Sequence, residues 1–266
     1  MCHDLSFSAN TVEFITDLLP DVIFTGQRSI DFSTTEHVLS MSHRKCLVVY
    51  NEDGQLKCSE FEWGLIAPFM YTPELVKQYR IQMANARVEK IFDKRSVWYK
   101  LREKNRCLVA VAGIMEHREI KGWKNKVPYY INLACSTHIL LPGFYNYSPN
   151  PDPETGEVKG TFSVITQPAN DIMKKIHNHG PNKHRMPLFM QPVQALKWVT
   201  NDLTDEQIKE FTSHEIPSEE LEVRPVFTVR TTKSRPDGKS KTESYEWPNL
   251  PPLGTDEVVK QNDLFA

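Results

Sequence analysis

A series of short apolar runs, each bounded by polar or turn-forming residues, constrains the fold of this chain most. The runs lie at 46–50, 56–63, 107–112, 129–134, 137–141 and 161–166. Runs this short predict β-strands, and Glu52-Asp53-Gly54 predicts a tight turn that joins the first two into a hairpin. Helical patterns fall between the runs without a repeating strand–helix–strand order. The sequence therefore predicts an α+β fold with mostly antiparallel strands.

The helices are expected where apolar residues recur at helical spacing or where a proline opens a segment. These segments are 8–19, 88–101, 168–176 and 192–199. Thr72 before Pro73 is typical of a helix start, and Thr204 with Gln207 matches a capping box that opens another helix. A late strand is expected at 222–230. The segment 146–160 carries three prolines and two glycines, so it predicts an exposed loop inside a hairpin.

The length of 266 residues suits one large core. We expect a single compact domain over 1–230, followed by a polar, acidic C-terminal extension over 231–266. Trp247 and Leu250 are the expected anchor of that extension.

The charges are distributed unevenly along the chain. Residues 73–133 hold 14 Lys and Arg against 6 Asp and Glu, whereas residues 201–266 hold 8 against 14. The middle of the chain could therefore attract a polyanion, which the end would repel. The alternative is that both regions are ordinary solvated surfaces.

The cysteines and the apolar segments indicate the compartment in which the protein is expected. The chain has 5 cysteines, without a Cys-x-x-Cys pair, which argues against a disulfide framework or a zinc site. No basic and then apolar leader opens the sequence, so we expect an intracellular, cytoplasmic protein. The longest apolar stretch, 107–115, is far shorter than the roughly 20 residues that span a bilayer. We expect no membrane association, metal or cofactor.

Cys2 is the first candidate for chemistry. Aminopeptidase removal of Met1 would leave an α-amine and a thiol on adjacent carbons, with reference pKa values of about 8 and about 8.5. Such an aminothiol condenses with an aldehyde to an imine, which the thiol closes to a thiazolidine. The thiol could instead attack a carbonyl, as in N-terminal-nucleophile amidohydrolases. The plain alternative is an incidental residue on a frayed terminus.

Further candidates follow along the chain, each with a structural alternative. Asn85 could contact a substrate oxygen or cap a helix, and Arg87 could bind phosphate or form a surface ion pair. Glu116 follows an apolar strand, where burial would raise its pKa and suit it to proton transfer, unless it reaches solvent. His177 is a candidate acid or base. His177, His179 and His184 are spaced too irregularly to indicate a metal site.

The order of these residues resembles the SOS response-associated peptidase (SRAP) family. The resemblance rests on Cys2, on Trp63-Gly64-Leu65-Ile66-x-Pro68, on Asn85-Ala86-Arg87-x-Glu89, on Cys107-Leu108 with Gly113-x-x-Glu116, on Ala169-Asn170 with Ile176-His177, and on Arg185-Met186-Pro187. It extends from residue 2 to about 200. It implies a compact α+β domain with a curved, barrel-like, mostly antiparallel sheet flanked by short helices.

The resemblance also implies a function. A protein of this family binds single-stranded DNA and crosslinks covalently to abasic sites, through a thiazolidine between its N-terminal cysteine and the ring-opened sugar. Cys2 would be the nucleophile, Asn85 would position the terminus and the sugar oxygen, and Glu116 would shuttle protons. His177 would promote opening of the sugar ring. The implied protein is a monomer, associated with the nucleoid when it acts on DNA.

The implied DNA contacts are Arg87 to a phosphate, Trp63 near the DNA groove, and Arg185. A peptidase or lyase activity is implied by the family as well, and Cys2 would be exposed by autoproteolysis or by an aminopeptidase.

The sequence departs from the family pattern at several places. His3 and Asp4 stand where the family usually has Gly and Arg, and His117 stands where it commonly has Trp. The segment 178–184 has a turn-forming composition that predicts a mobile surface insertion. These departures predict altered or weaker DNA binding. Two other functions stay open: a glutaminase-like amidohydrolase, although the chain has no Gly-Asn dipeptide for its oxyanion segment, and a DNA-binding module with weakened catalysis.

Overall fold

The computed structural model describes residues 2–26, 29, 37–200, 202–231 and 233–255. The strands are β1 (Asp4–Ser6), β2 (Ile23–Phe24), β3 (Val38–Leu39), β4 (Lys45–Glu52), β5 (Gln55–Trp63), β6 (Asn85–Arg87), β7 (Arg106–Val111), β8 (Gly113–Arg118), β9 (Val127–Leu133), β10 (Ile139–Tyr147), β11 (Gly160–Pro168), β12 (Arg185–Pro187) and β13 (Leu221–Pro225). The α-helices are α1 (Thr11–Leu18), α2 (Pro73–Tyr79), α3 (Val88–Ile91), α4 (Val97–Leu101), α5 (Asp171–Ile176), α6 (Pro192–Thr200) and α7 (Asp205–Thr212). The 3-10 turns are η1 (Ser40–Ser42), η2 (Arg80–Ala84) and η3 (Ser218–Glu220).

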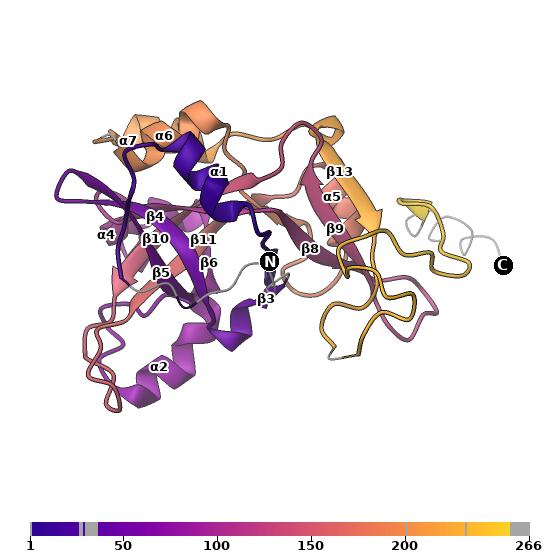
Figure 1. The fold of residues 1–266 in the computed structure, drawn as a ribbon, viewed down its shortest axis with the longest axis horizontal. Helices are drawn as coiled ribbons and strands as arrows, with labels where there is room; N and C mark the ends of the chain where they lie inside the picture. The colour runs from indigo at the N-terminus through magenta and orange to yellow at the C-terminus, as the bar shows by residue number, and fades with distance from the viewer. Residues whose placement is uncertain (1, 27–28, 30–36, 201, 232, 256–266) are drawn as a thin grey trace.

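The larger sheet closes on itself to form a barrel-like ring. Its strands follow the order β12-β11-β10-β7-β4-β5-β2, and a parallel pairing of β11 with β5 closes the ring. The neighbours β4 and β5, β4 and β7, β7 and β10, and β10 and β11 are antiparallel. Figure 1 shows this ring on one side of the molecule, with α2 below it and α6 and α7 above it. The predicted α+β class and the curved, mostly antiparallel sheet are confirmed.

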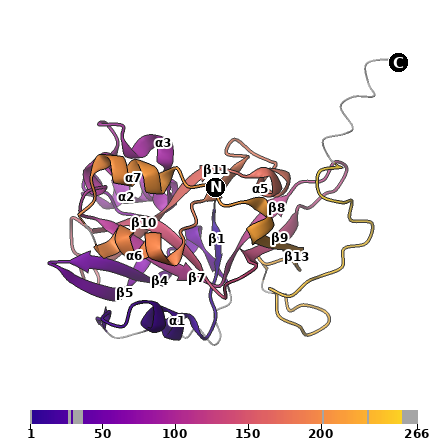
Figure 2. The same ribbon diagram turned by 90° about the horizontal axis from the view of Figure 1, so that it is seen from above.

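The smaller sheet follows the ring directly in the chain, because only one residue separates β7 from β8. β7 belongs to the ring, and the chain passes from it through Ala112 directly into β8 of the second sheet, whose order is β13-β9-β8-β1-β3. Gly113 stands at this passage because a Cβ there would lie 2.4 Å from the Tyr130 ring. In Figure 2, β1 lies between the ring and the strands β8, β9 and β13. The N-terminal strand is therefore seated where the two sheets meet.

Most of the expected elements are present, with a few differences. The helix expected over 88–101 is two short helices, because the chain turns between them: Ser96 N–H donates to the Asp93 carbonyl at 2.8 Å, and the Ser96 hydroxyl then caps α4. The capping box of Thr204 and Gln207 is present at the start of α7. The late strand ends at Pro225, earlier than expected. The strands β1 and β12 were not expected, since each has only three residues.

The described part of the C-terminal extension, from 231 to 255 apart from 232, lies against the second sheet. The Trp247 indole donates to the Val226 carbonyl at 3.0 Å, and the ring lies near that of Trp123. Arg118, itself buried, donates to the carbonyls of Pro251 and Pro252, each at 2.7 Å. The expected anchor at Trp247 is therefore present and is strengthened by Arg118. Within the described ranges, no helix is long and apolar enough to cross a membrane.

Candidate active site

Cys2 is fully buried where β1 meets β8. β1 pairs antiparallel with β8, with Asp4 opposite Met115 and Leu5 opposite Ile114. The Asn85 side-chain amide donates to the Cys2 carbonyl at 2.8 Å. The structure thus brings together two of the predicted site residues, which are 83 positions apart in the sequence. An N-terminal residue held on both sides in this way is not frayed.

Asn85 is fixed by the ring. It opens β6, which pairs in parallel with β11, so that Asn85 lies opposite Val164. The Trp63 indole donates to the carbonyl of Ala84, the preceding residue, at 2.9 Å. Trp63 itself is fully buried against Phe162. The expectation that Trp63 lies near the DNA groove is therefore corrected: its ring has no face exposed to a base, and it instead supports the segment that carries Asn85.

Glu116 lies on β8 in a buried position. Burial raises the pKa of its carboxyl to about 8. Burial also raises the pKa of the Cys2 thiol well above its usual range, and the nearby carboxylates of Glu116 and Asp4 add to that effect. At neutral pH, both groups therefore hold their protons.

Two buried side-chain oxygen atoms at this site lack a hydrogen-bond partner among the described residues. Glu116 Oε1 and Asn85 Oδ1 are both buried, and neither has a hydrogen-bond partner among the described residues. Buried polar atoms are nearly always paired, so two such oxygens near Cys2 indicate that a polar group binds there.

His177 is held at the end of α5. Asn170 caps the start of this helix, and Met173 and Ile176 pack into the core. His177 Nδ1 lies 2.8 Å from the Arg185 carbonyl. The Arg185 backbone N–H also lies within reach of Nδ1, at 3.3 Å, so the backbone of Arg185 fixes the orientation of the ring. Burial lowers the pKa of His177 to about 4, so the ring is neutral at pH 7.

The segment 178–184 is fastened to the core and is not the loose insertion that its composition suggests. Asn178 exchanges two hydrogen bonds with the backbone of Glu119, each at 2.9 Å, and His179 pairs with the Glu119 carboxylate. Asn182 accepts a hydrogen bond from Arg87. His184 is exposed and has a positive φ of 61°. Of the histidines weighed in the sequence, the structure thus places His177 inside and His184 outside.

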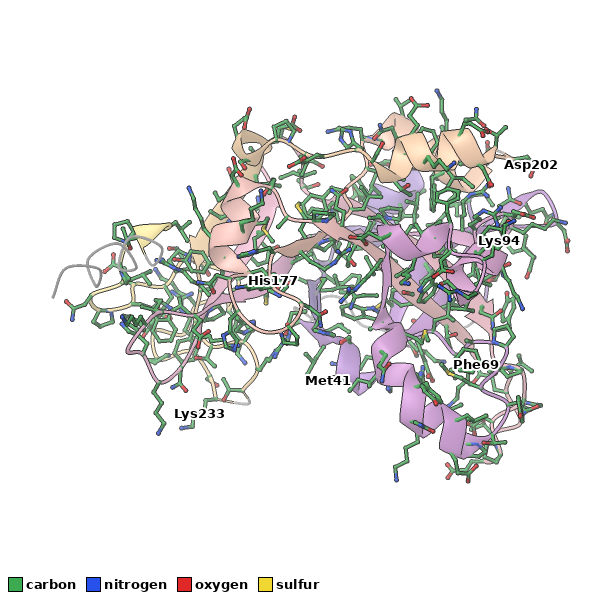
Figure 3. The ribbon with its side chains drawn as sticks, turned by 180° about the vertical axis from the view of Figure 1, so that it is seen from behind. Met41, Phe69, Lys94, His177, Asp202 and Lys233 are labelled. Carbon is green, nitrogen blue, oxygen red and sulfur yellow. The ribbon has the colours of Figure 1, made fainter. Side chains whose placement is uncertain are left out.

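Glu116 and His177 line one cavity of about 330 Å³, which we call the active-site cavity. Its lining includes His3, Glu116, His117, His177, Lys126 and Arg230. His177 is seen near the middle of the molecule in Figure 3, above Met41. At neutral pH Glu116 holds its proton and His177 is neutral, so a carboxylic acid and a neutral imidazole line the same cavity. Environments that separate two pKa values in this way are typical of acid–base catalysis.

The active-site cavity adjoins a second one of about 700 Å³, the Arg87 cavity. The two share His3 and Asn182, and the second is also lined by Asn85, Arg87 and Lys90. Arg87 is exposed, as a phosphate contact requires. Arg185 differs: it is buried, and it forms a two-pronged ion pair with Glu89 at 2.7 and 3.0 Å. The expectation that Arg185 contacts DNA is therefore corrected to an internal role beside His177.

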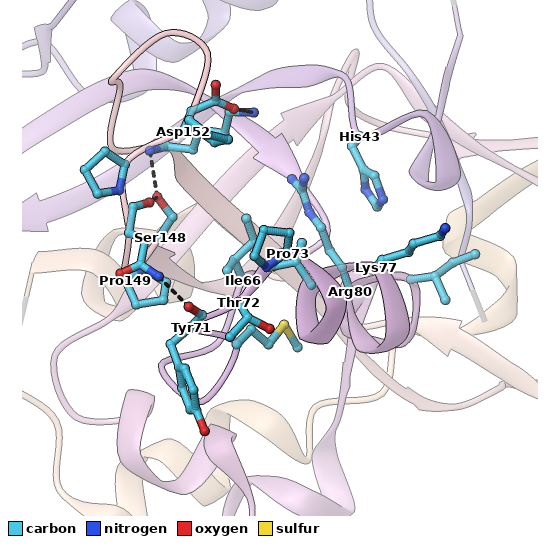
Figure 4. Close-up of a pocket in the computed structure, with 17 residues that line it drawn as sticks. His43, Ile66, Tyr71, Thr72, Pro73, Lys77, Arg80, Ser148, Pro149 and Asp152 are labelled. Atoms are coloured by element: carbon cyan, nitrogen blue, oxygen red, sulfur yellow. Dashed lines mark hydrogen bonds and ion pairs between the residues drawn. The ribbon is translucent and has the colours of Figure 1, made fainter.

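A third cavity of about 530 Å³, the α2 cavity, lies between α2 and the loop after β10. It shares Ile81 with the Arg87 cavity. Figure 4 shows Lys77 and Arg80 on its helical side and Ser148, Pro149 and Asp152 on its loop side. The segment 146–160 is thus an ordered wall, tied down by Asn150, which donates to the Tyr71 carbonyl. The three cavities form a series that leads from His177 to α2.

Three residues at the site were not identified from the sequence as contributors: His3, Asp4 and Arg230. His3 Nδ1 lies 2.7 Å from the Ser40 hydroxyl, and Arg230 reaches the site from the far end of the chain. His3 and Asp4 stood out only as departures from a pattern, and Arg230 gave no signal. No group of three or more metal-ligating side chains occurs in the part of the chain that the structure describes.

The family model of the SOS response associated peptidase (SRAP) matches residues 5–230. The chain belongs to the SRAP family. The family is associated by its name with the SOS response, which places the chain in a DNA-damage-associated group. The match begins after Cys2 and ends at Arg230, so the described C-terminal extension from 231 onward lies outside it.

Solved structures share the fold of this chain. A protein from Bacteroides thetaiotaomicron aligns with a TM-score of 0.70 at 26% identity, covering 91% of this chain and 97% of that one. A protein from Bordetella bronchiseptica aligns with a TM-score of 0.66 at 14% identity, over 85% and 100% of the two chains. A phage-related protein from the same organism gives 0.62 at 19% identity, over 86% and 95%. No curated protein matches the chain.

Proposed function

We propose that this protein binds single-stranded DNA and forms a covalent thiazolidine with abasic sites through Cys2, once Met1 has been removed. The observation that carries the proposal is the pair of buried side-chain oxygens near Cys2, Asn85 Oδ1 and Glu116 Oε1, that have no hydrogen-bond partner among the described residues. The α-amine released by loss of Met1 is a polar group of the kind that these atoms lack as a partner.

The reaction follows from the protons that the site holds. An abasic sugar in its ring-opened form presents an aldehyde, and His177 in its neutral form can take the proton of the sugar hydroxyl as the ring opens. The Cys2 amine then attacks the aldehyde carbon, and Glu116 protonates the departing hydroxyl, which leaves as water. The Cys2 sulfur adds to the resulting imine carbon, and the thiol proton passes to the imine nitrogen by way of the Glu116 carboxylate. One aldehyde, one amine and one thiol give one thiazolidine and one water.

The series of cavities supplies a path for the DNA strand. Arg87, Lys90 and Lys77 are exposed along the Arg87 and α2 cavities and can contact phosphates. Exposed apolar side chains accompany them, with Met41 47% and Ile81 46% exposed. Cations that follow a backbone together with apolar surfaces for the bases are typical of sequence-independent binding of single strands. Part of the excess of positive charge over 73–133 therefore lies along this path, where it can attract the DNA phosphates.

The test is to mix the mature protein with single-stranded DNA that carries one abasic site. We expect a product that survives a denaturing gel and has the summed mass minus one water. The same strand without the lesion should bind reversibly and give no such product. If the lesion-bearing strand also gives none, although mass spectrometry shows that Met1 is absent, the proposed function is wrong.

The amidohydrolase alternative shares Cys2 as nucleophile but needs oxyanion donors near its thiol. Asn85 Oδ1, which has no partner among the described residues and belongs to the side chain that holds Cys2, is an acceptor, so it suits an amine and not an oxyanion. Release of ammonia from glutamine by the mature protein, without any DNA adduct, would favour that alternative.

His177→Ala should slow crosslinking by about tenfold or more, because general acid–base groups contribute at least that much. His184→Ala should leave the rate near that of the wild type, because this side chain is exposed and outside the active-site cavity. Single-turnover rates at saturating DNA provide the measurement. A larger loss of rate for His184→Ala would show that the wrong histidine has been assigned.

A further inference from the structure

The carboxylate of Asp4, two residues beyond Cys2, is buried in an ion pair with a residue from the other end of the chain. Asp4 is 1% exposed. Arg230 Nε donates to Asp4 Oδ1 at 3.0 Å and Arg230 Nη2 donates to Oδ2, while His37 Nε2 lies 2.8 Å from Oδ1. Burial alone would raise the pKa of Asp4, but the hydrogen bonds from His37 and Arg230 outweigh it and lower the pKa to about 2. The acid that replaces the family's usual base is therefore neutralised within the protein.

Arg230 is itself held on both sides. Before it, Val226 forms a β-bridge with Ser244, and the Val226 carbonyl accepts the Trp247 indole N–H at 3.0 Å. After it, the Thr231 carbonyl accepts from Lys241 Nζ at 2.6 Å. The C-terminal segment thus fixes the arginine that Asp4 needs.

The same pair lies at the active-site cavity. Arg230 lines the cavity together with Glu116 and His177. Two nitrogens of the Arg230 guanidinium, Nε and Nη2, donate to the Asp4 carboxylate. The positive charge of Arg230 is therefore already balanced by a buried carboxylate. An arginine committed in this way is a weaker partner for a DNA phosphate than the exposed Arg87.

We propose that Arg230 is a positioning residue, which acts through Asp4 to hold the strand that carries Cys2 in the active-site cavity. This inference rests on the proposed function for its catalytic part. β1 has only three residues and ends near the chain terminus, so its own ladder bonds hold it weakly. Without Arg230, the buried Asp4 carboxylate would lose its main countercharge, and β1 would turn outward to hydrate it. Cys2 would move with the strand, and a reacting group must stay within about 0.5 Å of its working position.

The experiment compares Arg230→Gln, Arg230→Lys and the double variant Asp4→Asn with Arg230→Gln. We expect Arg230→Gln to lower the maximal crosslinking rate by about tenfold to hundredfold, because small misplacements have effects of that size. The DNA concentration at half-maximal rate should stay within about twofold, since no phosphate contact is lost. Arg230→Lys should recover part of the rate. The double variant should recover more, because it leaves no buried charge unpaired. Lys233→Gln removes a cation from the same segment at an exposed position away from Asp4, so it is the matched control.

A second measurement does not depend on DNA. Cys2 is fully buried, so its alkylation by iodoacetamide requires β1 to open. Peptide mass analysis should show that Arg230→Gln raises the rate of Cys2 alkylation by at least about fivefold, as expected for a local opening, and that the double variant restores protection.

The outcomes separate the inference from the proposed function. If the wild type crosslinks abasic DNA but Arg230→Gln keeps both its maximal rate and its protection of Cys2, the inference is wrong and the proposed function stands. A weaker salt dependence and weaker DNA binding at an unchanged maximal rate would make Arg230 a phosphate contact and would also overturn it. If the wild type does not crosslink, the proposed function fails, and the alkylation rates alone decide whether Arg230 holds the strand.

Discussion

Cys2→Ala is expected to abolish the covalent product with abasic DNA completely. The change removes the sulfur that closes the thiazolidine, while the chain still begins with an amine after loss of Met1. Cys2 is buried at the junction of the two sheets, next to His3, which lines the active-site cavity. Denaturing gels and intact mass provide the measurement.

Two further variants sharpen this test. Cys2→Ser keeps the amine and the shape of the side chain, so it should give an imine that borohydride traps but that reverses without reduction. Cys135→Ala is the matched control, because Cys135 is the cysteine that the structure shows as exposed. An undiminished product with Cys2→Ala, or a lost one with Cys135→Ala, would contradict the assignment of Cys2.

Glu116→Gln should slow formation or reversal of the crosslink by at least about tenfold, since a general acid–base group is removed while the shape is kept. The pH dependence carries the sharper signature. Burial raises the pKa of Glu116 to about 8, so the wild type should lose its acid-catalysed rate as the pH rises through about 8. The α-amine, with a reference pKa near 8, must lose its proton in the same range, so the wild type should show a rate maximum. In Glu116→Gln only the rising limb should remain.

The control for Glu116→Gln is Glu13→Gln, which changes an exposed carboxylate on α1. The change in stability with pH should have the opposite sign to that of an ordinary salt-bridged acid, whose contribution grows as the pH rises. The raised pKa of Glu116 means that the folded state favours the protonated form, so wild-type stability relative to Glu116→Gln should fall as the pH rises from about 4.5 toward 8. Thermal unfolding of the wild type and of Glu116→Gln between about pH 5 and about pH 8, which lies within the range of these two pKa values, measures the difference in stability. If the crosslinking rate of Glu116→Gln still falls as the pH rises through about 8, Glu116 is not the catalytic acid and its carboxyl has only a structural role.

The local elements were largely determined by the sequence. Period and length of the apolar runs gave β4, β5, β7, β9, β10 and β11, because a buried strand must be apolar over its own length. Proline and side-chain caps marked the starts of α2 and α7 for similarly local reasons. The break between α3 and α4 was missed, since it depends on Asp93 and Ser96 satisfying a turn in place of a helix.

The candidate site was only partly determined in the same way. The sequence predicts Cys2, Asn85, Glu116 and His177 as site residues. The structure joins Asn85 to Cys2 and places Glu116 and His177 on one cavity. The roles of Trp63 and Arg185 were misread, because residue type alone cannot show which aromatic ring or guanidinium is buried. The choice between His177 and His184 depended on which of them the end of α5 holds in the core.

Residues close together in the chain are enough to predict most of the strands and the helix starts, and to single out candidate reactive groups. The assembled fold is what brings Cys2 and Asp4 to residues far along the chain. The hydrogen bond between Asn85 and Cys2 spans 83 positions, and the pair of Arg230 with Asp4 spans 226. No local pattern encodes contacts over such separations, because they form only when the two sheets have assembled and water has left the junction between them. The buried acid of Glu116, the neutral His177 and the seat of Cys2 all depend on that assembly.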